Sequence, residues 1–322
     1  MSKPVKTKVS IQALATATGF STASVSRALN NKPNVRSDVR EKILEAATRL
    51  NYMPSSSSVV ANRIPLFVED LNNRELGNYE NLLISRIAKE LTGKSAFMEL
   101  ISLHEGFLFE SVYAKAGIAI VYLPDTVAML SAGAKFPIIT INNPMPGTLN
   151  VFSDHFAGMY DATTHLIAKG HRRIALFASE VKTWGTCERL NGYRAALEKQ
   201  GIPFDPALVG TDSPNIFVSL ATVMKSAPTA IVAAGEDYGM EISHGLYLLG
   251  KKVPEEISLL VYDDFFARYA TPPLSCLAPP FEEIARIAVE RAVAVTRGAE
   301  FVPGDIVLKS GLIERSSVRQ LA

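Results

Sequence analysis

The segment 19–35, GFSTASVSRALNNKPNV, carries short hydrogen-bonding side chains and a single arginine at helical spacing. Val25, Ala28 and Leu29 fall at i, i+3 and i+4 and form one narrow apolar stripe. The remaining side chains are small, so the helix can approach another surface closely. An arginine can bridge O6 and N7 of guanine, which contributes roughly 1–3 kcal/mol of base discrimination. The pattern therefore indicates a helix that enters the major groove of DNA, with Arg27 as the strongest contact.

The side chains around Arg27 differ in what they can reach on a duplex. Thr22 and Ala23, at the start of the helix, can touch base edges or a thymine methyl group. Ser26 and Asn30 are placed to hold phosphates. For each single contact, close packing of the small residue against the protein itself is the alternative. The predicted DNA contacts are Ser10, Ile11, Ser21, Thr22, Ala23, Ser26, Arg27, Asn30, Asn34, Tyr52 and Ala61.

Three short amphipathic helices are predicted to position these side chains. Ser10 can cap the first helix, Gly19 can end it, and Ser21 can cap the second after a very short turn. Ser37 and Asp38 favour the start of a third helix, whose apolar residues repeat at helical spacing: Val39, Ile43, Ala46, Ala47 and Leu50. Three helices with a tight, glycine-containing first turn are typical of a helix-turn-helix domain, whose second helix reads the major groove.

The charge of the chain is distributed unevenly along its length. Residues 1–63 carry ten Lys and Arg against three acids, a net charge of +7, so the remaining residues carry −6 of the total of +1. A basic head on an acidic body is typical of a nucleic-acid-binding module joined to another domain. A basic surface without such a partner is the alternative, and charge alone does not separate the two.

The rest of the 322-residue chain predicts an α/β module of two lobes. Apolar runs such as IPLFV, GIAIVYL, RRIALFA and ISLLVY have the composition of buried strands, and helix-length amphipathic segments separate most of them. This alternation is typical of parallel, doubly wound sheets. The module is too long for one ordinary core, so we expect two lobes with a ligand site between them at the carboxyl ends of the strands.

The composition excludes several other classes of protein. With 48% hydrophobic residues and no uninterrupted apolar stretch of about 18, the sequence offers no membrane span. The basic N-terminus leads straight into a polar helix, unlike a secretion signal, so a cytoplasmic protein is expected. Two distant cysteines, five histidines without zinc-site spacing and no nucleophile with its base predict no disulfide, metal, cofactor or catalytic residue.

The motifs of the chain also carry a family resemblance. The segments STASVSRALN, VRSDVREKI and LNYMP closely resemble the DNA-binding domain of the LacI/GalR family of bacterial repressors. The likeness continues over nearly the full chain in VFSDHFAGMYDATTHLIAKGHRRIALFAS, ERLNGYRAALEKQGI, KKVPEEISLLVYDDF, TPPLSCL and GLIERSS. This resemblance implies a ligand-responsive transcriptional regulator that binds a palindromic operator as a homodimer.

The resemblance also implies how the chain is divided. A helix-turn-helix domain is expected at 1–53, a hinge linker at 54–63, and an effector-binding and dimerisation module, similar to periplasmic binding proteins, at 64–322. The chain of that module is expected to cross between its lobes near Lys169, Ala278 and Lys309. These crossings give an N-lobe of about 64–168 and 279–308 and a C-lobe of about 169–278 and 309–322.

Ligand contacts are implied by the resemblance at Arg189, in CERLNGY, and at Asp263, in VYDDF. A guanidinium and a carboxylate that converge on a cleft can hold a hydroxyl-rich small molecule, so a carbohydrate is the first expectation. The alternatives are a surface salt bridge for the arginine and a strand-end cap for the aspartate. Weaker candidates lie on loops or could replace a missing aromatic contact: Glu69, Tyr79, Asp237 and Phe217.

Three departures from the family pattern bear on the ligand and on DNA. Gly235-Glu236 stands where the family usually has Asn-Asp, and Ser213 stands where several relatives have an aromatic residue. In the linker PSSSSVVANR, Ala61 replaces the leucine that in the family wedges into the minor groove. Four serines make a poor helix and a methyl group makes a weak wedge, so we expect less operator bending than in typical relatives.

Two functions remain for the chain. The first is a ligand-responsive repressor of a carbohydrate-related operon, whose partners are double-stranded operator DNA, a sugar or sugar derivative, and a second copy of the chain. The second is a cytoplasmic sugar-binding or sugar-processing protein whose basic N-terminal domain is incidental. Replacing Arg27 by alanine separates them, because only the first function requires specific DNA binding.

Overall fold

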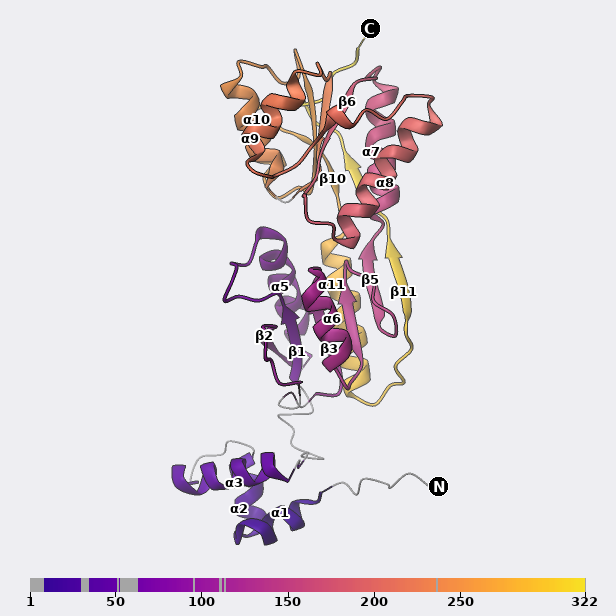
Figure 1. The fold of residues 1–322 in the computed structure, drawn as a ribbon. Helices are drawn as coiled ribbons and strands as arrows, with labels where there is room; N and C mark the ends of the chain where they lie inside the picture. The colour runs from indigo at the N-terminus through magenta and orange to yellow at the C-terminus, as the bar shows by residue number, and fades with distance from the viewer. Residues whose placement is uncertain are drawn as a thin grey trace, which may run out of the picture.

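The computed structural model describes residues 9–29, 35–50, 52, 63–94, 96–109, 112, 114–235 and 237–321. A small helical domain comes first along the chain, and two α/β lobes follow it (Figure 1). The predictions for Asn30, Asn34 and Ala61, and for the linker up to residue 62, concern residues outside the described ranges.

The N-terminal domain consists of three helices: α1 (Ile11–Thr18), α2 (Thr22–Leu29) and α3 (Ser37–Arg49). The Ser10 hydroxyl caps α1 by accepting the N–H of Ala13 at 3.1 Å. Gly19 ends α1 at φ 72°, a conformation that glycine adopts without strain. Ser21 caps α2 by accepting the N–H of Ser24 at 3.1 Å. The predicted three-helix arrangement is confirmed.

The core of this domain is small and apolar. Leu14 of α1, Val25 of α2 and Ile43 of α3 are fully buried where the three helices pack together. Tyr52, beyond the end of α3, packs against the same core and is only 4% exposed. Arg27 is exposed, because its position on α2 is more than half a turn away from Val25. One side of α2 therefore packs in the core of the domain, and the other side faces outward.

The first lobe is built on a sheet of six parallel strands: β1 (Arg63–Val68), β2 (Phe97–Ser102), β3 (Gly117–Ile120), β4 (Ile138–Ile141), β5 (Leu149–Ser153) and β11 (Gly304–Leu308). Their order in the sheet is β11-β5-β4-β3-β1-β2. Helices α5 (Asn78–Leu91) and α11 (Phe281–Thr296) cover one face of this sheet. Helix α6 (Pro124–Gly133) packs against the other face.

The second lobe has the same construction. Its strands are β6 (Ile174–Phe177), β7 (Val209–Gly210), β8 (Ala230–Ala233), β9 (Ser258–Tyr262), β10 (Ser275–Ala278) and β12 (Gly311–Ile313). They lie in the order β12-β10-β9-β8-β6-β7, and β12 alone of these strands is antiparallel. Its helices are α7 (His155–Ala168), α8 (Trp184–Lys199), α9 (Ile216–Met224) and α10 (Tyr238–Leu248), with short 3-10 helices η2 (Pro206–Leu208) and η3 (Ala267–Tyr269).

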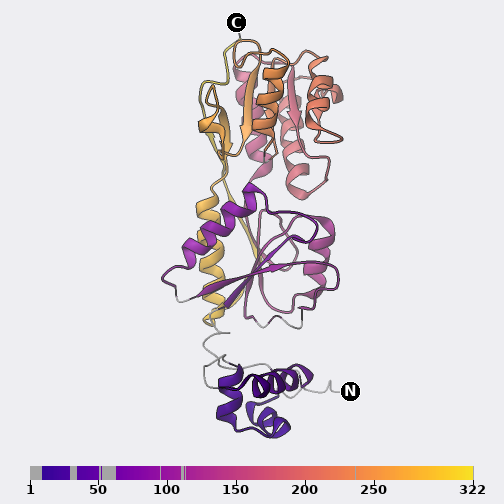
Figure 2. The same cartoon turned by 90° about the vertical axis from the view of Figure 1, so that its left-hand side faces the viewer.

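The helices of the second lobe also cover both faces of their sheet. α7 and α8 pack on one face, and α9 and α10 pack on the other. The two lobes lie end to end (Figure 2). Both lobes are therefore doubly wound, as predicted from the alternation of apolar runs and amphipathic segments. No helix in the described part of the chain is both long and apolar enough to cross a membrane.

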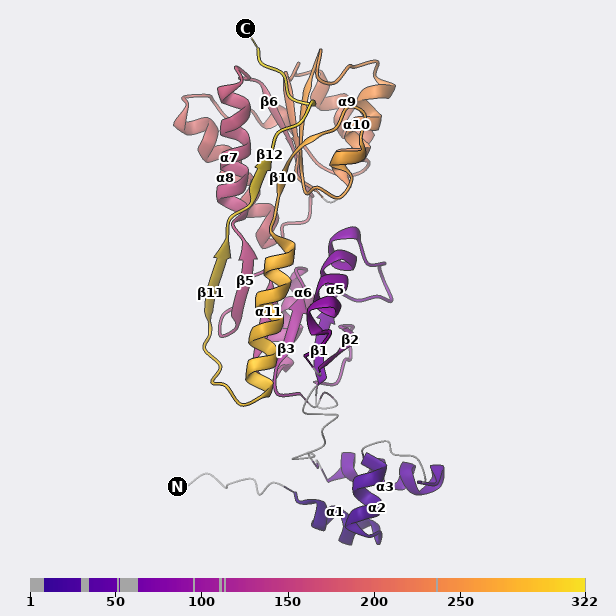
Figure 3. The same cartoon turned by 180° about the vertical axis from the view of Figure 1, so that it is seen from behind.

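The chain passes three times between the lobes. β5 ends in the first lobe and α7 begins in the second, so the first passage is at Asp154 and not near Lys169 as expected. The reason is packing: the apolar side of α7 belongs to the core of the second lobe, beside β12 (Figure 3). The other passages lie at 279–280 and 309–310. The N–H of Asp154 donates to the carbonyl of Leu308 at 2.9 Å, which joins the first and third passages.

Candidate functional site

A cavity of about 310 Å³, the interlobe cleft, lies between the two lobes. It is formed at the carboxyl ends of the strands, where doubly wound sheets bind ligands. The first lobe contributes Tyr79, Tyr122, Leu123, Asn142 and Phe281. The second lobe contributes, among others, His155, Ser179, Thr186, Arg189, Tyr238, Tyr262 and Asp263. Arg189, Asp263 and Tyr79, all predicted as ligand contacts, are thus brought together around one cavity.

Arg189 comes from the second turn of α8. Its guanidinium carbon lies 5.0 Å from the centroid of the Tyr262 ring, in cation–π contact. The Nε atom is buried and has no hydrogen-bond partner among the described residues. Asp263 directly follows β9 at φ 75°, a left-handed conformation that costs a non-glycine residue roughly 1–3 kcal/mol. Its N–H donates to the carbonyl of Leu277 at 2.8 Å, so the backbone at this position is anchored to β10.

A buried histidine–tyrosine pair lies next to Arg189. His155 Nδ1 and Tyr262 Oη are 2.5 Å apart, and the two side chains are 6% and 4% exposed. Burial lowers the pKa of His155 well below its usual range, and the positive charge of Arg189 lowers it further. Burial raises the pKa of Tyr262. Both groups are therefore neutral, and either can donate in the hydrogen bond between them, because a neutral imidazole nitrogen donates or accepts according to its tautomer.

The wall of the cleft in the first lobe is held by a buried carboxylate. Glu80 is 0% exposed and accepts hydrogen bonds from Arg74 and from Tyr122 Oη, both at 2.7 Å. It also accepts the N–H of Gly77 at 2.9 Å. Arg74 donates to the oxygen of Tyr122, whose pKa is raised by burial. The Tyr122 ring is therefore fixed in position by groups behind it.

Glu69, a predicted ligand residue, is not among the residues that line the cleft. Its carboxylate is 1% exposed and accepts the N–H groups of Tyr122 and Leu123 at 2.6 and 2.9 Å. The hydroxyl of Thr126 also donates to it. A carboxylate at this place stabilises the N-terminus of α6 through hydrogen bonds and the helix dipole. Glu69 therefore stabilises the start of α6 within the first lobe.

Asp237 and Phe217 also lie outside the lining of the cleft. Asp237 precedes α10 and accepts a hydrogen bond from the Asn78 amide of the first lobe at 2.8 Å. This contact joins the two lobes directly. Phe217 is 37% exposed, and its ring packs edge-on against His244 at a centroid distance of 6.0 Å.

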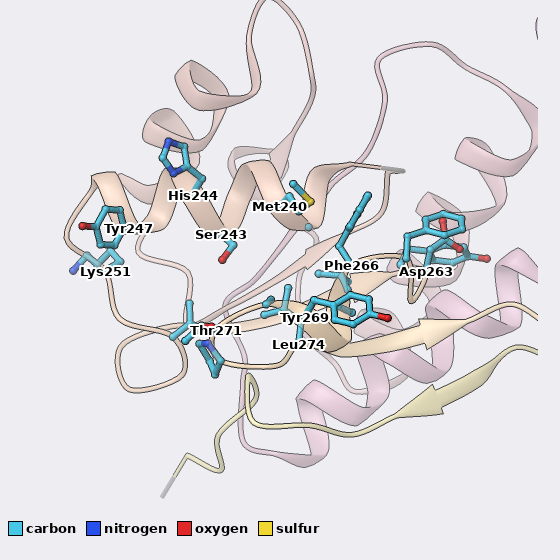
Figure 4. A pocket seen from close by; sticks show the side chains of 18 of the residues that line it. Met240, Ser243, His244, Tyr247, Lys251, Asp263, Phe266, Tyr269, Thr271 and Leu274 are labelled. Atoms are coloured by element: carbon cyan, nitrogen blue, oxygen red, sulfur yellow. The ribbon is translucent and has the colours of Figure 1, made fainter. Parts of the chain in front are cut away.

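A larger cavity, of about 640 Å³, lies beside α10 in the second lobe (Figure 4). The segment from Asp263 to Leu274 forms its other wall, so Asp263 lines both cavities. Large apolar side chains are exposed at this cavity and at the end of α10, and we call them the α10 surface: Met240, Tyr247, Leu248, Leu249, Phe266 and Tyr269. Sequence reasoning missed this surface, although ISHGLYLLG carries more apolar residues than one buried helix face requires.

Other cleft residues were also missed by the sequence reasoning. Tyr262 ends β9, and His155 and Tyr122 come two residues after strands. Position at a strand end was the signal that could have found them, because ligand sites in such folds gather there. In the described part of the chain, no group of three or more histidine, cysteine, aspartate or glutamate side chains could hold a metal ion.

The predicted DNA contacts that the structure describes lie mainly on the surface of the helical domain. Ala23 and Arg27 are exposed on α2, whereas Thr22 and Ser26 are half-buried. Two more predicted contacts, Ser10 and Ser21, are exposed helix caps. Ile11 is half-buried against the core, and Tyr52 is buried in it. The exposed side of α2 is therefore lined by small residues and one arginine.

Two family models match the chain. The model for bacterial regulatory proteins of the lacI family matches residues 10–55, which contain the three helices and their caps. The model for the periplasmic binding protein-like domain matches residues 163–318, which contain Arg189 and Asp263. The chain therefore joins a DNA-binding domain of the lacI family to a periplasmic-binding-protein-like domain. The helical domain is the DNA-binding domain, and the two lobes form the periplasmic-binding-protein-like module.

Known relatives resemble this chain over nearly its full length. It is 26% identical to the HTH-type transcriptional regulator DegA of Bacillus subtilis (strain 168), across 98% of this chain and 99% of the relative. Among solved structures, a complex of the transcriptional regulator CelR with cellobiose is 24% identical, with a TM-score of 0.70 over 96% of this chain and 100% of that one. A lac repressor dimer bound to operator is 21% identical, with a TM-score of 0.69 over 97% and 99%.

Proposed function

We propose that this protein is a ligand-responsive transcriptional repressor of the LacI family and not an enzyme. It binds a palindromic operator as a homodimer, and it binds a carbohydrate in the interlobe cleft. The observation that carries the proposal is the presence, in one chain, of an exposed α2 side around Arg27 and of a cleft that Arg189 and Asp263 both line. Operator binding places its action with the chromosome, in the cytoplasm.

The outward side of α2 is the proposed reading surface. Arg27 contacts a guanine through two of its three guanidinium nitrogens, and Ala23 lies close enough to the groove for a methyl contact. Thr22 contacts base edges, and Ser26 contacts a phosphate. Ser10, at the N-terminus of α1, holds the backbone of the duplex, because helix N-termini attract phosphates. Exposure supports the roles of Ser10, Ala23 and Arg27, whereas Thr22 and Ser26 are half-buried.

The interlobe cleft is the proposed effector site. Arg189 and Asp263 hold polar groups of the ligand, while Tyr79 and the other aromatic residues pack against its carbon skeleton. A carbohydrate is supported by the names of relatives, which include a ribose operon repressor from Haemophilus influenzae and the CelR–cellobiose complex. The proposed target is therefore an operon of carbohydrate metabolism.

The segment after β9 is proposed to couple ligand binding in the interlobe cleft to operator binding. Asp263 lines the interlobe cleft, and Tyr269 belongs to the α10 surface. Between them, Phe265 stacks on Phe281 of the first lobe, with ring centroids 5.8 Å apart and planes at 7°. A ligand that draws Asp263 toward it shifts this segment against both lobes. A coupling of about 1–3 kcal/mol, roughly 5- to 150-fold in operator affinity, is the usual scale of such effects.

The α10 surface is the proposed contact with the second copy of the chain. Tyr247 and Tyr269 are 77% and 78% exposed, which is unusual for large aromatic side chains unless a partner covers them. Figure 4 shows both side chains at the larger cavity. A homodimer formed here would carry two DNA-binding domains, one for each half of a palindromic operator.

The experiment that tests the function is an operator titration with Arg27→Ala. A duplex selected by the wild-type protein from a random pool serves as operator, and one half-site serves as the control for dimeric binding. We expect the substitution to lower operator affinity roughly 5- to 150-fold, which corresponds to the loss of about 1–3 kcal/mol of base recognition. Arg194→Ala is the matched control, because Arg194 lies on exposed α8 surface over the Phe204 ring.

The outcome separates the two functions that the sequence left open. A sugar-binding or sugar-processing protein with an incidental basic domain would bind every duplex equally, and Arg27→Ala would change nothing specific. Repeating the titration with candidate sugars shows whether the effector releases the protein from DNA or recruits it. An operator affinity that no ligand changes would contradict ligand-responsive regulation.

A further inference from the structure

The loop between β9 and β10, residues 263–274, contributes to three different surfaces of the protein, and we call it the β9–β10 loop. Asp263 lines the interlobe cleft, and Phe265 stacks on Phe281 of the first lobe. Tyr269, at the end of η3, is exposed on the α10 surface (Figure 4). A change in the shape of this loop therefore alters the cleft, the contact between the lobes and the α10 surface together.

The β9–β10 loop packs unevenly against the second lobe. Ala267 and Leu274 are buried in the core of that lobe, and the N–H of Leu274 donates to the carbonyl of Ala267 at 2.8 Å. These contacts hold the middle and the end of the loop. None of the described residues 264–266 belongs to that core. The start of the loop therefore depends on contacts of another kind.

Arg315, in the segment that follows β12, joins the start of the loop to its end. One guanidinium nitrogen is 2.9 Å from the carboxylate of Asp264, and another donates to the carbonyl of Leu274 at 2.7 Å. The Arg315 and Asp264 side chains are 17% and 12% exposed. Charge-assisted hydrogen bonds are stronger than neutral ones, and the planar fork of an arginine can form several of them at once. One side chain thus closes the loop from outside.

Arg315 is itself fixed to the second lobe. Its N–H donates to Ser275 Oγ at 2.9 Å, and that hydroxyl donates to the Arg315 carbonyl at 3.2 Å. Asp264 has a second partner, Arg268, at 2.6 Å, but Arg268 belongs to the loop and its side chain is 56% exposed. An ion pair within the loop does not anchor the loop to the rest of the lobe. The anchor of Asp264 is therefore Arg315.

We propose that Arg315 is a positioning residue, which holds the β9–β10 loop in one shape and thereby couples the interlobe cleft to the α10 surface. This inference rests on the proposed function, because both surfaces take their roles from it. Without the guanidinium, Asp263 and Tyr269 keep their side chains but lose their fixed separation. We therefore expect dimerisation to weaken, although neither Arg315 nor Asp264 belongs to the α10 surface.

Hydrogen exchange and sedimentation equilibrium of the full chain test the inference with two variants. Arg315→Lys keeps the charge without the planar fork, and Asp264→Asn removes the charge of the partner. The amides of Tyr269 and Leu274 donate hydrogen bonds within the loop. In both variants they should exchange about tenfold faster, because hydrogen bonds to charged groups are among the stronger ones. The dissociation constant of the dimer should rise about tenfold as well.

Arg173→Lys is the matched control, because it replaces a guanidinium that also holds a carbonyl and a carboxylate. Arg173 Nε donates to the carbonyl of Ser226 at 2.9 Å, and its guanidinium lies 3.8 Å from Asp205. All three residues lie outside the β9–β10 loop. This variant should leave exchange in the loop unchanged and the dimer dissociation constant within about twofold of the wild type.

A double variant tests whether the two side chains act through one contact. If they do, combining Asp264→Asn with Arg315→Lys should weaken the dimer no more than the stronger single substitution, since both remove the same interaction. Additive effects would show that Arg315 and Asp264 act separately, which would contradict the proposed anchor.

Three further results would overturn the inference. They are exchange in the loop that neither variant accelerates, a dimer dissociation constant that neither variant changes, and an equal change in Arg173→Lys. A purely structural role of Arg315 would give the second result, with lower stability in urea and an intact dimer. Titration of the wild-type protein with a full operator and with one half-site decides the proposed function separately. A wild-type protein that prefers the full operator keeps that function, whatever the Arg315 variant does.

Discussion

The outward side of α2 and the interlobe cleft use their side chains in different ways. On α2, Arg27 and Ala23 are exposed, while the core of the domain is formed from the opposite side of the helix. In the cleft, Tyr122 and Tyr262 face the cavity with their rings and hold buried groups of the protein with their hydroxyls. Recognition and stability are thus separate on α2 and combined in the cleft.

This difference follows from the size of the partner. A duplex meets a helix from outside, so the side chains that read it need not contact the core behind them. A small ligand must be surrounded by the protein. The residues that line its site therefore also belong to the cores of the two lobes and form buried hydrogen bonds there. Substitutions on the outward side of α2 should therefore change binding alone, whereas substitutions in the cleft should change stability as well.

The largest expected effect comes from Glu80→Ala, behind the cleft wall. The substitution leaves Arg74 without its carboxylate at 2.7 Å, and it removes the acceptor for Tyr122. Removing one partner of a buried ion pair is strongly destabilising, because it leaves the other charge without compensation. We therefore expect the free energy of unfolding to fall by about 3–5 kcal/mol. Urea unfolding followed by circular dichroism measures this change.

Arg27→Ala is the matching variant on the outward side of α2. It should leave the free energy of unfolding within about 0.5 kcal/mol of the wild type, because the side chain is exposed and away from the core. The contrast between the two regions would be wrong if both variants unfolded at the same urea concentration.

A second, smaller effect concerns pH and His155. Burial holds the pKa of this histidine well below the unfolded value of about 6.5, so the unfolded chain takes up a proton that the folded chain does not. The contribution of the neutral His155 side chain to the free energy of unfolding is therefore complete above about pH 6.5. It is lost as the pH falls toward the folded pKa, at up to about 1.4 kcal/mol per pH unit. Urea unfolding at pH 7.5 and 5.5 measures this loss.

His155→Gln should reduce that pH dependence without removing it. The pKa values of His165 and His171 are also lowered by burial, so these residues continue to destabilise the folded chain in acid. On α2, by contrast, Arg27→Ala should leave the pH dependence unchanged. An unchanged slope in His155→Gln would show that the cleft histidine does not carry the expected linkage.

The smallest expected effect is that of Asn78→Ala, at the contact between the lobes. Its amide donates to Asp237 at 2.8 Å in an exposed position, so the bond contributes about 0.5–1 kcal/mol to this arrangement of the lobes. The affinity of the cleft for its ligand should fall roughly two- to fivefold in calorimetric titration. Asn81→Ala is the control, because that amide bonds to Leu76 within the same lobe. Equal effects of both variants would contradict a role for the interlobe contact.

Much of the fold could be predicted from local signals. Ser10, Gly19 and Ser21 mark helix ends through hydrogen bonds to residues three or four positions away, and the structure has those bonds. Most of the central strands, such as β1, β3, β6 and β9, were predicted from their apolar runs, whereas the buried strands β5 and β10 were not. The first passage between the lobes was not, because α7 could cover either sheet and its apolar stripe does not specify which.

The candidate site was predictable only in part. Arg189, Asp263 and Tyr79 line the cleft, as the resemblance and the loop positions indicated. Glu69 has the same kind of position after a strand, yet its carboxylate holds the start of α6. Residue type and position after a strand do not distinguish these two environments, because the distinction depends on which backbone N–H groups lie nearby.

The sequence by itself determined the helical DNA-binding domain, its basic charge, its exposed arginine and the doubly wound character of the lobes. Each of these depends on residues within one or two turns of a helix or within one strand. Only the tertiary structure decided which polar groups are already bonded, since His155 meets Tyr262 across 107 residues and Asn78 meets Asp237 across 159. A contact between distant segments depends on how whole elements pack, and no local pattern contains that information.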